Sequence, residues 1–452
     1  MLNEQASSSQ ERPVWRKQDF EDDDRKKNDP FTDIREQVEQ VMRITGERFV
    51  DDEPGQELEM MIASPMHNYL VTYEGELIKG SEQAYDELDD LLKEQDRFAL
   101  FRKGDDDTQA PHQIHILGGR IKPAQGRPWL NLLLFLLTLA SVFFVGSFQG
   151  IAYTLELNPD LDRSEFYYES EAGELPRLSQ MWRGYPYALS IMLILGAHEL
   201  GHYFMARRHN HSVSLPYFIP MPISALGTMG AVIRSREPMR NKKVLMDIGA
   251  AGPLAGLVFA VPILLIGLAT SPVMYRLEPG THGLEGNSIL YALAKIVVHG
   301  QFLPSATEDV FINQMAFAGW LGLLVTALNL IPVGQLDGGH VLYSLFGKRA
   351  RQAFYPVMGA MVILALLSQV WLVWVILLFF LGRLYLPPLD DITPLNTPRR
   401  NVAIFTLVIF VLVFVPRPFT IYTIEEDDII PPEQQQQVFA PTMETPLMLD
   451  RE

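Results

Sequence analysis

The sequence predicts a polytopic α-helical membrane protein of about six to seven spans, preceded by a small N-terminal α+β soluble domain. Two observations predict this fold class. Long apolar runs lie between about residues 129 and 416 of the 452 residues, and a membrane-spanning helix needs about 20 mostly apolar residues. Residues 1–127, in contrast, are rich in charge, with acidic runs at 22–24 and 105–107. The chain is therefore expected to join a soluble part to a membrane part.

The soluble part is predicted from short periodic patterns. Residues 1–55 are expected to be a largely disordered, acidic region because apolar anchors are few there. One short helix is expected within it, where Ile34, Val38 and Val41 share a face. A soluble α+β domain is then expected over 56–125. Its predicted elements are strands at 69–73, 98–102 and 112–117 and a helix over 84–92. We interpret His112 and His115 as polar strand positions rather than as a metal pair.

The membrane part is expected over 126–416, followed by an acidic, disordered tail over 417–452. Its candidate spans are 129–148, 185–205, 244–268, 310–331, 353–386 and 402–415. The stretch 353–386 is too long for one untilted span, so we divide it near Ser368 into two short helices. With that division the count is seven spans, and a single crossing of this stretch remains the alternative.

The basic residues predict the orientation in the membrane. Arg120, Lys122 and Arg127 precede the first span, which places the N-terminus in the cytoplasm. Residues 1–40 lack the apolar core of a signal peptide, so the first internal span is expected to direct insertion. The basic loops alternate correctly only if 353–386 crosses twice. We therefore expect a multi-pass protein of a bacterial inner (cytoplasmic) membrane with a cytoplasmic N-terminus.

Net charge and cysteine content exclude several classes of function. The formal charge is −17 and no long basic stripe is present, which argues against a nucleic-acid partner. The chain contains no cysteine, so disulfides, thiolate ligands and cysteine nucleophiles are excluded. Any transition-metal site must therefore be built from His, Asp and Glu.

A metal-binding pattern lies near the end of the second candidate span. His198, Glu199 and His202 form the pattern H-E-x-x-H. Positions i and i+4 share a helix face, so both imidazoles can reach one ion. Glu199 lies about 100° around the helix from His198, where it can act as the base for the water that such an ion activates. Placing these polar residues in an apolar span costs free energy, which favours a metal site over a hydrogen-bonded polar cluster.

The third ligand is expected from residues 329–340, at the end of the fourth candidate span. A catalytic zinc ion usually has three protein ligands and one open position. Pro332 ends or kinks the helix, and Asp337 follows before two glycines. Irregular backbone at membrane depth needs a buried polar environment, so Asp337 is the favoured ligand. His340 is the competing candidate, as a ligand or as a residue that orients one.

These patterns together resemble the site-2 protease family of intramembrane zinc metalloproteases. H-E-x-x-H at 198–202 and N-x-x-P-x-x-x-L-D-G at 329–338 are both complete, and the runs 252–256 and 227–233 are also similar to that family. The resemblance, over about 185–345, implies Zn²⁺ held by His198, His202 and Asp337. It implies that Glu199 is the catalytic base and that Asn329 orients substrate or stabilises the oxyanion. The soluble domain resembles the branch with plastid and cyanobacterial members, and the loop 271–309 is too short for a PDZ domain.

The implied activity is hydrolysis of peptide bonds in or near transmembrane segments. The expected partners are single-span membrane protein substrates and the lipid bilayer, and a soluble regulator of the N-terminal domain is a further candidate. An ion transporter is one alternative, but it predicts internal symmetry between halves that is not visible. A catalytically silent scaffold is another, but it has no need of Glu199. A metalloprotease with a Glu third ligand would show a downstream E-x-x-x-D pattern, which is missing.

The segment 212–236 is a candidate substrate contact. It is extended in character, with three prolines followed by the strand-like run 227–233. A helical substrate hides its carbonyls in i→i−4 hydrogen bonds and must unwind before it is cut. The segment is therefore either a re-entrant hairpin that pairs with the unwound substrate by strand addition or a plain connecting loop.

Overall fold

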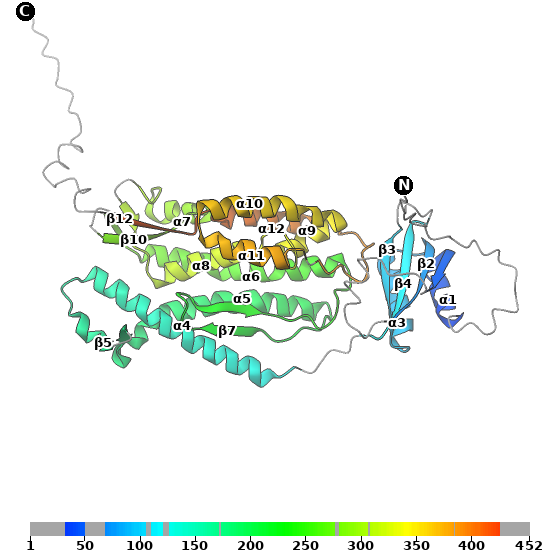
Figure 1. Ribbon diagram of the computed structural model, residues 1–452, viewed down its shortest axis with the longest axis horizontal. Helices are drawn as coiled ribbons and strands as arrows, with labels where there is room; N and C mark the ends of the chain where they lie inside the picture. Colours follow the sequence, from blue (N-terminus) through cyan, green and yellow to red (C-terminus); the bar gives the residue numbers. More distant parts are fainter. Residues whose placement is uncertain are drawn as a thin grey trace, which may run out of the picture. The chain divides into compact units, whose positions relative to one another are not determined.

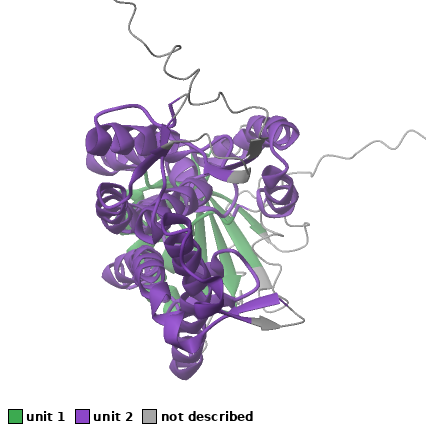
Figure 2. Cartoon of the chain, turned by 90° about the vertical axis from the view of Figure 1, so that its left-hand side faces the viewer, with its two compact units in different colours: residues 1–122, 386–394 green, residues 123–385, 395–452 purple. Residues whose placement is uncertain are grey.

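A computed structural model of the protein describes residues 32–49, 68–104, 110–120, 126–170, 173–275, 280–305, 308–383 and 385–424. Within it the chain divides into two compact units, coloured separately in Figure 2. Unit 1 comprises residues 1–122 and 386–394, and unit 2 comprises residues 123–385 and 395–452. The expected disorder of residues 1–30 lies outside the described residues. The tail was expected to be disordered from residue 417, but its residues Phe419–Ile424 form strand β12, which pairs with a strand at Gly280–Glu285. The rest of the tail, from residue 425 onward, lies outside the described residues.

Unit 1 contains a four-stranded antiparallel sheet in the order β1-β2-β4-β3. The strands are β1 (Met42–Phe49), β2 (Asn68–Leu77), β3 (Arg97–Lys103) and β4 (His112–Gly118), and the helices are α1 (Thr32–Glu39) and α3 (Ser81–Lys93). The core forms where the apolar stripes of both helices pack on alternate sheet residues, among them Ile34, Val38, Leu88, Leu92, Tyr73, Phe101 and Ile114. Burial of these side chains is the main source of stability for the unit.

The structure contains the strands and the helix expected over 69–117, and it adds one strand that the sequence did not indicate. β1 pairs antiparallel with β2 from Met42 to Phe49, within the stretch assigned to the region before the domain. Its sequence, MRITGERF, carries three charged residues and a glycine, so the local pattern is weak. Pairing with a neighbouring strand, a tertiary interaction, stabilises it. The sheet therefore begins before residue 56.

Unit 2 is a bundle of helices with short strands between them (Figure 1). The helices are α4 (Pro128–Leu157), α5 (Tyr185–Arg208), α6 (Lys242–Ala269), α7 (Ile289–His299), α8 (Gln314–Asn329), α9 (Asp337–Phe346), α10 (Phe354–Leu367), α11 (Val370–Leu381) and α12 (Thr397–Val413). Short antiparallel pairs join β5 (Tyr167–Ser170) to β6 (Gly173–Pro176), β7 (Tyr217–Met221) to β8 (Gly227–Val232), β9 (Val273–Tyr275) to β11 (Glu308–Val310), and β10 (Gly280–Glu285) to β12 (Phe419–Ile424).

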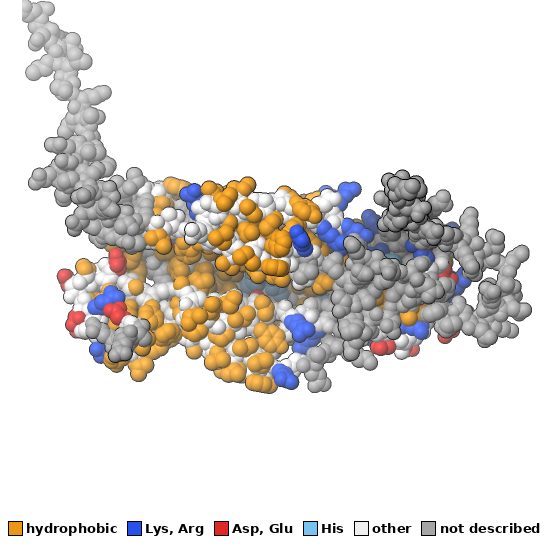
Figure 3. Space-filling model, in the orientation of Figure 1, with side chains coloured by type: hydrophobic (Ala, Val, Ile, Leu, Met, Phe, Trp, Pro, Cys, Tyr) orange, Lys and Arg blue, Asp and Glu red, His pale blue; other side chains and the backbone are white. Residues whose placement is uncertain are grey.

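Within the described residues, four helical segments are long and apolar enough to cross a membrane. They are Pro128–Leu157, Leu178–Arg208, Lys242–Ala269 and Asp337–Leu367, and α7, α8 and α11 are shorter apolar helices. Hydrophobic side chains cover much of the visible face of these helices (Figure 3). Leu366 on α10 and Val373 on α11 are 83% and 70% exposed. A contiguous apolar surface of this kind is unfavourable in water, as expected of helices that face lipid.

The spans differ in detail from those expected. α10 ends at Leu367 and α11 begins at Val370, so the break predicted near Ser368 is confirmed. α11 then ends at Leu381 rather than at residue 386, and α8 has 16 residues. α7 was not expected, although Ser288 caps its first turn and Gly300, in the left-handed conformation, ends it. The count of six to seven spans remains a prediction.

Candidate metal centre

α5 presents both histidines of the H-E-x-x-H pattern on one face. The helix starts with Pro186 in its first turn and ends at Arg208, before Asn210 takes a positive φ of 54°. His198 and Glu199 are only 5% and 7% exposed. The Nε2 atoms of His198 and His202 lie 3.2 Å apart. The i, i+4 spacing therefore brings the two imidazoles to one point in the protein interior.

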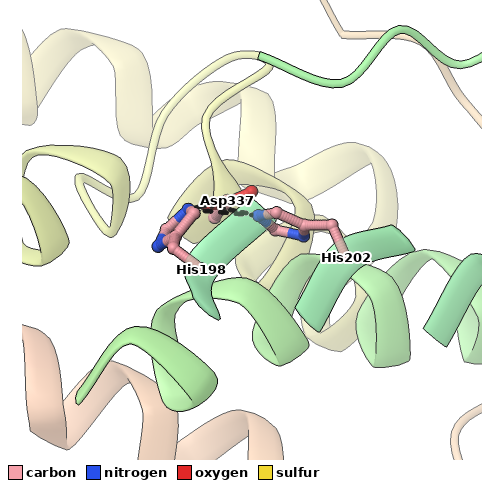
Figure 4. A group of neighbouring side chains, drawn as sticks. All are labelled: His198, His202 and Asp337. Carbon is pink, nitrogen blue, oxygen red and sulfur yellow. Dashed lines mark hydrogen bonds and ion pairs between the residues drawn. The ribbon is translucent and has the colours of Figure 1, made fainter. Parts of the chain in front are cut away.

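The chain leaves helical conformation between α8 and α9, and this places Asp337 close to the imidazoles of His198 and His202. α8 ends at Asn329, three residues before Pro332, and α9 begins at Asp337. The chain turns tightly here: a Cβ at position 338 would lie 2.0 Å from the carbonyl oxygen of Leu330, so only glycine fits. As Figure 4 shows, the Asp337 carboxylate meets both imidazoles. The structure therefore places Asp337, at the start of α9, beside the two histidines of α5.

The three side chains form a triangle of ligand atoms. Asp337 Oδ2 lies 3.4 Å from His198 Nε2 and 3.3 Å from His202 Nε2, and the third side of the triangle is the 3.2 Å between the imidazoles. A tetrahedral zinc ion with bonds of about 2.0 Å separates its ligand atoms by about 3.3 Å, because a tetrahedron's edge is about 1.63 times its centre-to-corner distance. All three separations match this value, so the residues fit a tetrahedral ion with one open corner.

The backbone of α6 sets the orientation of His202. Its Nδ1 lies 2.8 Å from the carbonyl oxygen of Ile248. A carbonyl can only accept a hydrogen bond, so Nδ1 carries the proton and Nε2 of the neutral ring keeps a free lone pair. This is the usual arrangement by which a second hydrogen bond fixes a metal-binding histidine. The lone pair points toward the other two ligand atoms.

Three glycines of α6 form the floor of the centre. A Cβ at Gly252 would lie 2.0 Å from His202 Nε2, and one at Gly256 would lie 3.3 Å from His198 Cβ. A Cβ at Gly249 would lie 3.0 Å from His340 Cβ. The metal centre therefore needs a helix surface without side chains at these positions. The sequence showed the run 252–256 only as a family likeness, and its spacing of glycines at i, i+3 and i+7 was the signal that was missed.

Glu199, Asn329 and His340 lie around this triangle. Glu199 follows His198 on α5 and is buried. Asn329, the last residue of α8, places its Nδ2 3.4 Å from His198 Nε2. His340 lies one turn after Asp337 on α9. Among the described residues, the group whose ligand atoms lie within 4.8 Å of one another comprises His198, His202 and Asp337, and His340 is outside it.

Charge balance is consistent with a divalent ion. Two neutral imidazoles and the Asp337 carboxylate supply one negative charge, so a bound dication leaves one positive charge. The Glu199 carboxylate offsets that charge, which matters because an unpaired charge in a protein interior is costly.

His112 and His115 lie on β4, where His115 Nδ1 is 2.7 Å from the Thr72 hydroxyl, in agreement with their interpretation as strand residues.

Comparison with known proteins identifies the domain that carries this centre. Residues 186–369 match the description "Peptidase family M50". "Probable zinc metalloprotease EGY2, chloroplastic" of Arabidopsis thaliana is 32% identical over 244 residues, covering 52% of this chain and 42% of the relative. "Probable zinc metalloprotease EGY1, chloroplastic" of the same plant is 30% identical over 299 residues, covering 64% of this chain and 53% of the relative.

The chain thus spans about half the length of the curated relatives it matches. No solved structure matches it significantly. The matched region contains His198, Glu199 and His202 of α5 and Asp337 of α9, together with the α6 glycines beneath them. Residues 186–369 therefore form a domain of peptidase family M50, the site-2 protease family.

Proposed function

We propose that this protein is an intramembrane zinc metalloprotease that hydrolyses peptide bonds in or near transmembrane segments of single-span substrates. The observation that carries the proposal is the triangle of His198, His202 and Asp337, with sides of 3.2, 3.4 and 3.3 Å. Both histidines lie on a helix long and apolar enough to cross a membrane. The names of the relatives, zinc metalloproteases, support zinc as the ion.

The residues of the chain have distinct parts in the proposed reaction. Zinc, when bound, lowers the pKa of water toward neutrality and polarises a peptide carbonyl. Glu199, next to His198 but outside the ligand triangle, accepts the proton of the attacking water and passes it to the leaving amine. Asn329, with its amide 3.4 Å from His198 Nε2, donates a hydrogen bond to the substrate carbonyl as charge develops on its oxygen. Asp337 and the histidines stay in place throughout.

The β7–β8 hairpin is the proposed substrate contact. Its strands pair antiparallel from Tyr217 opposite Val232 to Met221 opposite Gly227, and no third described strand pairs with it. α4 holds the hairpin by its backbone, since Asn131 donates to the carbonyl of Pro216 and Ser141 donates to that of Gly227. A hairpin anchored in this way keeps a strand edge available to an unwound substrate.

The membrane and the sidedness of the protein are part of the proposal. We propose seven spans with the N-terminus in the cytoplasm and the acidic tail outside, in a bacterial cytoplasmic membrane; the compared relatives are described as chloroplastic. A reporter enzyme fused after residue 430 tests the count. Activity outside the cytoplasm supports seven spans, and activity inside contradicts them.

Substitution of Glu199 by Gln tests the mechanism. Glu199→Gln should abolish cleavage of a membrane-anchored substrate in proteoliposomes and leave bound zinc near one ion per chain. Asp337→Ala should lower the zinc content as well. Glu156→Gln, the same change at an exposed position of α4, is the matched control and should cleave normally. Retained cleavage by Glu199→Gln would contradict the mechanism and favour a scaffold or transporter.

A further inference from the structure

A segment from the membrane part of the sequence completes the sheet of the soluble unit. Residues 386–394 follow α11 in the chain and precede α12, yet they belong to unit 1. The amide of Phe101 on β3 donates to the carbonyl of Leu389 at 2.9 Å, and the amide of Asp391 donates to the carbonyl of Phe101 at 3.1 Å. β3 is the last strand of the sheet, so this segment, here called the clasp, pairs with an edge that would otherwise expose its backbone.

Side chains of the sheet and of α3 reinforce the clasp. The Arg102 guanidinium donates to the carbonyls of Pro388 and Leu389 at 3.0 and 2.9 Å. The hydroxyls of Ser81 and Thr393 lie 2.7 Å apart. Hydrogen bonds with an ionised donor are stronger than neutral ones, so the guanidinium is the strongest of these polar contacts.

Asp390 holds the clasp in its turned shape. Its carboxylate accepts hydrogen bonds from the amides of Ile392 and Thr393 at 2.9 and 3.1 Å and from the Thr393 hydroxyl. The side chain is 0% exposed. A buried carboxylate needs such partners, and among the described residues the partners of this carboxylate belong to the clasp. Removing the carboxylate should therefore open the turn.

The residues on either side of the clasp pack in hydrophobic clusters that include residues of α9, the helix that starts with Asp337. Just before the clasp, Tyr385 is buried against Tyr343 of α9, with ring centres 6.1 Å apart, and its hydroxyl donates to the carbonyl of Ala350. Just after it, Leu395 packs against the cluster that contains Val341 of α9. Asp337 thus begins a helix that shares a hydrophobic cluster with the residue on each side of the clasp.

We propose that the soluble unit is a control module for the metal centre and that it acts through the clasp. When the clasp is bound to β3, Tyr385 and Leu395 are restrained, and α9 keeps Asp337 within 3.4 Å of the two imidazoles. When the clasp leaves β3, this restraint is lost and the third ligand is held less firmly. The soluble unit therefore regulates the peptidase unit instead of only recruiting partners. This inference rests on the proposed function for the nature of the metal centre.

The test uses the full chain and two readouts, neither of which is activity. The protein contains no cysteine, so Ile392→Cys introduces a single thiol at a clasp position that packs against the core of unit 1. Labelling of this thiol by a maleimide reports release of the clasp. Loss of zinc to a chelator reports the metal centre. Asp390→Ala should raise both rates, with zinc loss about tenfold faster, a modest value for coupled sites. Leu386→Ala, at an exposed position of the clasp, is the control and should change neither.

A variant with longer linkers on both sides of the clasp distinguishes control through the clasp from general damage to the fold. Four-residue Gly-Ser insertions between Tyr385 and Leu386 and between Pro394 and Leu395 leave the clasp bound but uncouple it from α9. Zinc loss in this variant should be as fast as in Asp390→Ala, and adding Asp390→Ala should cause no further increase, since both changes break one link. A further tenfold increase would overturn the inference.

Three other outcomes would overturn a part of this inference or the proposed function. Faster labelling of the Ile392→Cys thiol in Asp390→Ala, at an unchanged rate of zinc loss, would overturn control through the clasp. Unchanged labelling would overturn the assignment of Asp390 as the residue that holds it. If the unaltered protein bound no zinc and cut no substrate, the proposed function would fail, a result distinct from zinc-loaded protein that ignores changes in the clasp.

Discussion

A methyl group added to the floor of the metal centre should expel zinc. Gly252 lies on α6 directly beneath His202, and an alanine Cβ at this position would lie 2.0 Å from His202 Nε2, 2.4 Å from Cδ2 and 2.5 Å from Cε1. These three atoms belong to the side of the ring that carries the ligand atom. Gly252→Ala therefore perturbs the position of one ligand and leaves the three ligand residues themselves unchanged.

The expected magnitude follows from these distances. Carbon and neighbouring heavy atoms approach no closer than about 3.5 Å without repulsion, so the ring must move by about 1.5 Å. Zinc–nitrogen bonds tolerate deviations of only about 0.2 Å. Loss of a hydrogen bond that merely orients a ligand lowers metal affinity by about 10–100-fold. Displacement of the ligand should cost more, so we expect zinc affinity to fall by at least about 100-fold.

The assay compares three glycine variants. Bound zinc per chain is measured on purified protein during titration with a chelator of known affinity. Gly196→Ala is the matched control, because it lies on α5 close to the ligands but has nothing within 4 Å of its added Cβ. Gly256→Ala should be intermediate, since its added Cβ would lie 3.3 Å from His198 Cβ and a small shift relieves the contact.

Two results of the zinc titration would contradict this prediction. If Gly252→Ala bound zinc as tightly as the unaltered protein, His202 would not approach α6 as described, and the assignment of its Nε2 as a ligand would lose its support. If Gly196→Ala also lost zinc, the effect would reflect helix packing in general rather than the geometry of the floor.

Three further predictions concern metal, substrate and pH. Zinc at 100 times its Kd should stabilise chelator-treated protein by about 2.7 kcal/mol, seen as a higher melting temperature that Asp337→Ala abolishes; an equal rise in that variant would place the ion elsewhere. Gly227→Ala should slow proteolysis at unchanged zinc content, because its φ is 73° and its added Cβ would lie 2.8 Å from Val142 Cα. Gly230→Ala, with a positive φ in open space, controls for backbone strain, and equal rates in both variants would argue against docking on α4. Burial lowers the pKa of His211, which lies after α5, and the neighbouring His209 lowers it further, although Glu237 acts in the opposite direction. Unfolded His211 then takes up a proton that the folded protein excludes, so stability should fall as pH drops below about 6.5. His211→Gln should flatten this fall in melting temperature between pH 7 and 5, and an unchanged slope would assign it to another group.

Much of the membrane unit could be predicted because its signals are local. Apolar runs of about 20 residues indicate spans whatever surrounds them, and the break near Ser368 was visible as a polar interruption. The i, i+4 spacing of His198 and His202 guarantees a shared face on any helix. The strand β1 and the helix α7 were not predicted. β1 depends on pairing with β2, and α7, with 11 residues, is too short to be recognised as a membrane span.

The sequence by itself determined that His198, Glu199 and His202 stand together, because one turn of helix fixes their spacing. It named Asp337 only as a candidate, 135 residues after His202 (337 − 202), with His340 as its rival. The tertiary structure places Asp337, and not His340, within 3.4 Å of both imidazoles, because the chain turns tightly at Gly338. It alone also placed residues 386–394 on the edge of β3. Contacts between residues so distant in the chain depend on how helices and strands pack, and no local pattern encodes that packing.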